Sequence, residues 1–91
     1  MAVFILTLND KSSGVIRLVK NLGVFQKRSQ AYLFIVNERT HLNPPLLGGH
    51  FKFVDLQSIQ AREQELGYNP DKELIYENDF WCVLAEKANL V

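Results

Sequence analysis

The acid that closes the first apolar run, Asp10, is placed where a carboxylate can do chemistry. It directly follows the segment AVFILTLN (2–9), and an acid there can bind a metal ion or act as a general base. The same position suits an acid that begins a turn or caps a helix. Because no second acid lies nearby in the sequence, we interpret Asp10 as a turn residue and keep it as the only catalytic candidate.

Two histidines and one cysteine are the soft metal ligands of the chain. His41 and His50 flank the segment HLNPPLLGGHF (41–51), called the Pro/Gly loop below, and Cys82 stands alone in FWCVL. No short paired spacing and no close carboxylate completes a ligand set. We therefore expect no metal site and no cofactor, and we expect Cys82 to be a buried, unreactive thiol.

The Pro/Gly loop has a mechanical explanation as a connection. Its prolines fix an extended start, and Gly48 and Gly49 allow the positive φ angles that turn the chain into the next strand. Between them, Leu46 and Leu47 form a small apolar tip. We keep these two leucines as candidate contacts with a partner.

Aromatic residues gather near an acidic turn in the last part of the chain. Tyr76, Phe80 and Trp81 surround Asn78-Asp79, and aromatic anchors with a charged rim are typical of protein interfaces. These side chains are therefore further partner-binding candidates. The alternative is that they pack on the sheet.

The formal net charge is zero, but it is unevenly distributed. The charged residues within 11–39 are mostly basic and those within 55–87 mostly acidic, so the first half can bind an anion or the two halves can neutralise each other. Nucleic acid would meet four basic residues, with aromatic side chains stacking on bases. A neutral domain lacks the basic balance usual in such binders. The candidates for this contact are Arg17, Lys20, Lys27 and Arg28.

Length and composition bound the class of protein. The chain has 91 residues, of which 47% are hydrophobic, so we expect one globular domain over residues 1–91. The apolar run at the start has no basic lead and no cleavage site, which predicts neither a signal peptide nor a membrane span. A single cysteine favours a reducing compartment, and we expect a cytoplasmic protein.

Hydrophobic periodicity predicts the elements that carry these residues. We expect strands over 2–9, 31–36, 51–56 and 73–77, a helix over 15–22 closed by Gly23, and a helix over 58–66. Residues 80–88 fit either a strand paired through an Asn78-Asp79 turn or a helix. The order predicts an α+β, ferredoxin-like two-layer sandwich (β-α-β-β-α-β) with a C-terminal extension.

This layout resembles that of the small ferredoxin-like nucleases associated with CRISPR adaptation. Those proteins place an aspartate at the end of the first strand and act as dimers, and QKRSQAYLFIV (26–36) is similar to their second strand. Asn9-Asp10 stands where they have Tyr-Asp. The resemblance implies a metal-assisted phosphodiesterase that would use Asp10.

Apolar residues on both sides of the predicted strands carry the functional prediction. A sheet face that bears several large apolar side chains has to be covered, either by the C-terminal segment or by a second subunit. We therefore predict a small regulatory or accessory protein without enzyme activity, which forms a homodimer or higher oligomer and binds another protein. The alternative is a nucleic-acid-binding protein or a metal-assisted phosphodiesterase of ferredoxin-like fold.

Overall fold

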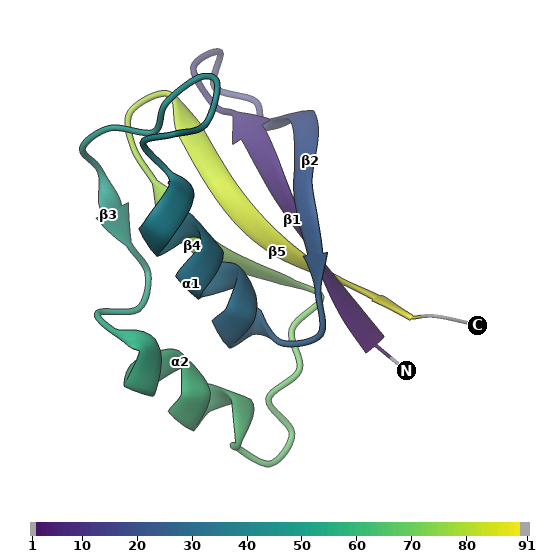
Figure 1. Cartoon of the computed structure of the whole chain (residues 1–91). Coiled ribbons are helices and arrows are strands. Elements are labelled where there is room, and N and C mark those ends of the chain that lie inside the picture. The colour runs from purple at the N-terminus through teal and green to yellow at the C-terminus, as the bar shows by residue number, and fades with distance from the viewer. Residues whose placement is uncertain (1, 90–91) are drawn as a thin grey trace.

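The computed structural model describes residues 2–89, which form one five-stranded sheet and two helices. All neighbouring strands are antiparallel, in the order β2-β1-β5-β4-β3. Figure 1 shows the longer helix lying across one face of the sheet and the shorter helix beyond it. In chain order the elements are β1 (Ala2–Asp10), β2 (Arg17–Phe25), α1 (Arg28–Glu38), β3 (His50–Phe51), α2 (Leu56–Glu63), β4 (Lys72–Glu77) and β5 (Trp81–Asn89).

One apolar core joins the sheet to both helices. Alternate residues of β1 point into it, and α1 and α2 cover them with apolar side chains. No helix within residues 2–89 is long and apolar enough to cross a membrane. The core residues from these three elements are Phe4, Leu6, Leu8, Ala31, Tyr32, Ile35 and Ile59.

The prediction of an α+β, ferredoxin-like two-layer sandwich with a C-terminal extension is wrong. The structure is mostly strand, and its sheet order differs from that of a β-α-β-β-α-β fold. Two elements were assigned the wrong type: residues 15–22, predicted as a helix, lie mostly in β2, and residues 31–36, predicted as a strand, lie in α1. The layout that supported the resemblance to the nucleases is therefore not the layout of this chain.

β2 is a strand because β1 needs a backbone partner along its length. The two strands pair from Phe4 opposite Phe25 to Asp10 opposite Arg17, which satisfies backbone groups that would be costly to leave unpaired. Two bulges place Leu22 and Val19 out of register as extra residues. Val15, Leu18 and Val19 remain exposed, so the apolar residues that suggested a helix do not form a buried helical face.

α1 forms because its start is capped and its buried residues recur at helical spacing. The Gln30 side-chain oxygen accepts hydrogen bonds from the backbone N–H groups of Gln26 and Lys27, at 3.0 and 3.2 Å. Ala31, Tyr32 and Ile35 face the core. The apolar run AYLFIV suits a strand by residue type, but tertiary packing decides the outcome.

The strands at the two ends of the chain agree more closely with the predictions from the sequence. The strand predicted over 2–9 is confirmed as β1, and the one over 73–77 as β4. Residues 80–88, for which strand and helix were both open, form most of β5 and pair with β4 as a hairpin. Asn78 builds the turn, since its side-chain oxygen accepts hydrogen bonds from the backbone N–H groups of Phe80 and Trp81.

The middle of the chain is only partly as predicted. Instead of a strand over 51–56, only His50 and Phe51 pair with β4. The helix predicted over 58–66 is α2, which begins and ends earlier. Asp55 fixes its start by accepting a hydrogen bond of 2.8 Å from the Ser58 backbone N–H.

The sheet face away from the helices mixes polar and apolar side chains. Ile5 lies between Val24 and Glu86 on the neighbouring strands, and Thr7 lies opposite Leu84. The Thr7 hydroxyl donates to the Glu86 carboxylate at 2.8 Å. Residues 31–36, which contributed to the prediction of two apolar faces, are in a helix. Oligomerisation through this face stays a prediction.

Candidate functional site

Three connections meet at one end of the molecule, here called the loop end and made up of residues 11–16, 43–49 and 78–80. Figure 1 shows them together at the top of the view, far from the ends of the described chain. The backbone N–H of Lys11 donates to the Phe80 carbonyl at 3.0 Å. The Asn78 amide donates to the Leu47 carbonyl at 3.1 Å. These bonds hold the three connections in one surface.

The Pro/Gly loop is fixed against β4 by close backbone contact. The Tyr76 hydroxyl donates a hydrogen bond to the Gly48 carbonyl. Gly49 has φ +70° and approaches β4 so closely that a Cβ atom would lie 2.2 Å from the Glu77 carbonyl oxygen. Only glycine fits there, so this loop is held in one conformation by the strand beside it.

A pocket of about 270 Å³, called the loop-end pocket, opens between the Pro/Gly loop and the β4–β5 turn. Leu47 and Phe80 line it, together with three groups that form a charge cluster. The Glu77 carboxylate lies 3.3 Å from the Lys11 ammonium and 3.1 Å from His50 Nε2. The pocket therefore combines apolar walls with a paired charge cluster, and Asp79 adds a further acid to its lining.

Four large apolar side chains stand out from this end of the molecule. Val15, Ile16, Leu47 and Phe80 have exposed fractions between 59% and 62%. Apolar side chains that gather on one surface with polar neighbours mark contact sites more often than scattered ones do. The loop end therefore has the composition of a protein interface.

Of the partner-binding residues that the sequence suggested, some line the surface pocket and others are buried in the core. Leu47 and Phe80 meet at the loop-end pocket, whereas Leu46 and Tyr76 are completely buried in the core. Trp81 is half-buried and packs against the core. Sequence reasoning missed Val15 and Ile16, because residues 15–22 were assigned to an amphipathic helix whose apolar side would be buried.

Asp10, the catalytic candidate, organises the turn after β1. Its Oδ1 accepts hydrogen bonds from the Ser12 backbone N–H at 2.8 Å and from the Ser12 hydroxyl at 2.6 Å. These bonds hold the pKa of the Asp10 carboxyl below its usual value. Within residues 2–89 no three histidine, cysteine or acidic side chains gather where they could hold a metal ion.

The four basic candidates for nucleic-acid contact do not form one compact patch. Arg17 begins β2, and Lys27 follows its other end, so the strand separates them by about 30 Å at ~3.3 Å per residue. The Lys20 ammonium donates to the Asn43 carbonyl at 2.6 Å. Arg28 is buried and donates to the Pro70 carbonyl at 2.8 Å.

The soft ligands also lie apart from one another. His41 pairs with Glu38 at 3.2 Å, and His50 pairs with Glu77 at the loop-end pocket. Cys82 is buried opposite Asn9 on the sheet face away from the helices. Burial raises the pKa of the Cys82 thiol, which keeps it protonated and weakly nucleophilic.

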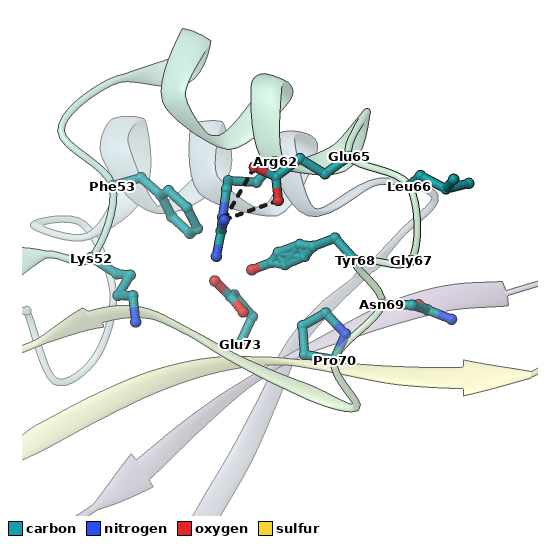
Figure 2. A pocket seen from close by; sticks show the side chains of 10 residues that line it. All are labelled: Lys52, Phe53, Arg62, Glu65, Leu66, Gly67, Tyr68, Asn69, Pro70 and Glu73. Atoms are coloured by element: carbon teal, nitrogen blue, oxygen red, sulfur yellow. Dashed lines mark hydrogen bonds and ion pairs between the residues drawn. The ribbon is translucent and has the colours of Figure 1, made fainter.

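A larger pocket of about 690 Å³, called the side pocket, lies between α2, residues 64–71 and β4. Figure 2 shows the Arg62, Tyr68 and Glu73 side chains pointing toward one another inside it. The Arg62 guanidinium lies 4.5 Å from the centre of the Tyr68 ring and pairs with Glu65 at 2.9 Å. Burial, and then the neighbouring Glu73 carboxylate, raise the pKa of Tyr68 to about 12.

Arg28 fixes the chain behind this pocket. Its guanidinium carbon lies 4.3 Å from the centre of the Phe4 ring and 5.6 Å from that of Tyr68. Its hydrogen bond to the Pro70 carbonyl ties residues 64–71 to the start of α1. The residue that sequence reasoning offered for nucleic acid is thus part of the support of the side pocket.

Comparison with known proteins gives this chain no family. No family model, no curated protein and no solved structure matches it. The surfaces just described, the loop end and the side pocket, are therefore what the function has to be inferred from.

Proposed function

We propose that this protein is a small regulatory or accessory factor without enzyme activity, which binds another protein through its loop end. The observation that carries the proposal is that Leu47 and Phe80, both largely exposed, line one pocket, while the connection beside it carries the exposed side chains of Val15 and Ile16. Apolar anchors surrounded by charged groups are the usual source of binding energy in protein interfaces.

The chemistry of the loop end indicates the kind of partner. Leu47 and Phe80 stand on two sides of the loop-end pocket, which suits an apolar side chain inserted between them. Lys11 and His50 both pair with Glu77, whereas Asp79 lines the same pocket without an ion pair among the described residues. We therefore expect a partner that presents an apolar anchor residue with polar neighbours.

Affinity capture with a paired surface variant tests this proposal. The wild-type protein, the L47S/F80S variant and the control V54S are immobilised, and proteins retained from the source cells are identified by mass spectrometry. Val54 is 86% exposed and lies outside the loop end, between β3 and α2. We expect a protein that is retained by the wild type and by V54S but lost from L47S/F80S.

Thermal unfolding of all three proteins checks that the variants fold. We expect similar unfolding temperatures, because the substituted side chains are exposed and contribute little to the core. Retention of the same proteins by L47S/F80S and the wild type would argue against the loop end. Sedimentation of the wild type identifies the case in which the partner is a second copy of this chain, as the sequence predicts.

A cytoplasmic location is part of the proposal, and the lone, buried Cys82 supports a reducing compartment. Cell fractionation tests it directly. Binding of nucleic acid, the alternative drawn from the sequence, stays a prediction without a compact basic surface to support it.

A further inference from the structure

The side pocket holds a carboxylate whose position in the sheet is unusual. Glu73 lies on β4 opposite Ala85, a core residue, and is only 7% exposed. A charged group on the core-facing side of a strand is costly unless it is paired or hydrogen-bonded. Glu73 lines the side pocket, and this position explains how a carboxylate is tolerated on that side of the strand.

Glu73 keeps unused capacity to accept hydrogen bonds. Within residues 2–89 no cationic nitrogen lies within 4.0 Å of its carboxylate, and the Tyr68 side chain points toward it (Figure 2). A carboxylate can accept about four hydrogen bonds. Figure 2 shows its oxygens directed into the pocket, below Arg62. A ligand with several N–H donors would satisfy this carboxylate.

Lys52 supplies the opposite charge at the same pocket. It follows β3, and its backbone N–H donates to the Ile75 carbonyl at 3.1 Å, which fixes its position beside β4. In the part of the chain that the structure describes, no acid lies within 4.0 Å of its ammonium. Arg62, by contrast, is already paired with Glu65. Besides the Arg62–Glu65 ion pair, the pocket therefore presents one further cation and one buried anion that do not pair with each other.

Apolar and aromatic side chains form part of the remaining wall of the side pocket, beside the polar Glu65 and Asn69. Phe53 and Pro70 line it and Tyr68 adds an aromatic ring, whereas the exposed Leu66 side chain points away from it (Figure 2). The volume of about 690 Å³ lies within the range of small-molecule sites. These walls suit the apolar part of a small ligand whose charged groups reach Glu73 and Lys52.

We propose that the side pocket binds a free α-amino acid with an apolar side chain, whose ammonium contacts Glu73 and whose carboxylate contacts Lys52. Such a zwitterion neutralises both charges and covers the apolar walls at the same time. This site lies outside the loop end, so it is independent of the proposed binding of a protein partner.

Calorimetric titration with three matched probes tests the charge requirement. L-Leucine carries both charges, N-acetyl-L-leucine lacks the ammonium and L-leucinamide lacks the carboxylate. We expect saturable binding of leucine, and weaker binding of each analogue by about tenfold or more, because hydrogen bonds to charged groups are the strong ones. Absence of saturable binding of leucine, or equal binding of all three probes, would overturn the proposal.

Single variants assign each charge to its residue. E73Q should weaken the binding of leucine and of leucinamide by about tenfold and leave the binding of N-acetyl-leucine unchanged. K52Q should weaken the binding of leucine and of N-acetyl-leucine by about tenfold and leave the binding of leucinamide unchanged. E38Q and K72Q, outside the pocket, serve as charge-matched controls. If E73Q fails to fold, titration of the wild type with the three probes still tests whether binding requires both charges of the ligand. Equal effects of E73Q and E38Q on a folded protein would overturn the assignment.

Discussion

At the scale of single residues, the adjacent glycines of the Pro/Gly loop have different structural requirements. Both have positive φ, but a Cβ atom on Gly48 would meet nothing within 4 Å, whereas one on Gly49 would meet β4. We expect G48A to cost about 1–2 kcal/mol of unfolding free energy from the backbone conformation alone. G49A should cost about 2–4 kcal/mol, because the loop has to move away from the strand. Urea denaturation measures both, and equal costs would contradict the close approach.

The alkaline stability of the protein depends on Tyr68. Its pKa is raised to about 12, first by burial and then by Glu73, against about 10 in an unfolded chain. The folded state therefore holds the proton more tightly. The resulting stabilisation is fully present below about pH 10 and is lost as the pH rises toward 12.

The variant Y68F tests this dependence, since phenylalanine does not ionise. Between about pH 10 and 12 the wild type should lose more unfolding free energy than Y68F, as measured by denaturant titration at each pH. The absorbance of tyrosinate in the folded protein gives the pKa independently. Parallel pH curves for the two proteins would show that Tyr68 ionises as it does in the unfolded chain.

At the scale of elements, the sequence predicted the outer parts of the chain and failed in the middle. β1 and β4 were predictable because long apolar runs with turn residues at their ends are typical of strands. Residues 15–22 have apolar residues at helical spacing, yet they pair with β1 through the backbone. That pairing is a long-range contact, which local periodicity does not contain.

The candidate site was predictable only in part, for a related reason. Leu47 and Phe80 stand out in the sequence as apolar residues beside turns, and both line the loop-end pocket. Val15 and Ile16 were not predicted as exposed contact residues, because residues 15–22 were assigned to an amphipathic helix. Glu73 and Lys52 line the same side pocket because β3 pairs with β4, and no spacing in the sequence indicates this.

The start of α2 depends on one side chain. Asp55 Oδ1 accepts hydrogen bonds from the backbone N–H and the hydroxyl of Ser58, each at 2.8 Å. D55A should lower the urea midpoint, whereas D55N should keep most of the stability, because asparagine caps helices about as well as aspartate. Equal losses in the two variants would mean that charge, and not the cap, stabilises this helix start.

The same cap has a defined pH dependence. The bonds from Ser58 hold the pKa of Asp55 below its usual value, so its stabilisation is present above the ordinary pKa and is lost as the pH falls through the folded value. The difference in midpoint between the wild type and D55A should therefore shrink in acid. A constant difference from about pH 7 to pH 2 would contradict this.

At the scale of the whole molecule, the strands differ in how extensively their backbones pair with neighbouring strands. β1 and β5 each have a strand on both sides, whereas β3 contributes only two paired residues at one edge. α2 packs chiefly against α1. α2 and residues 64–71, which form most of the side pocket, are therefore attached to the rest of the molecule by few long-range contacts. The loop end, by contrast, is held by hydrogen bonds between its three connections.

Amide hydrogen exchange, followed by NMR, tests this division. Amides of β1 and β5 should exchange most slowly, with protection close to the global free energy of unfolding, and those of α2 should exchange at least about tenfold faster through local opening. The central strands can open only by breaking pairs on both sides, whereas α2 can detach while the sheet remains intact. If α2 amides exchanged as slowly as those of β1, the molecule would open as a single unit, and the side pocket would be as rigid as the core of the sheet.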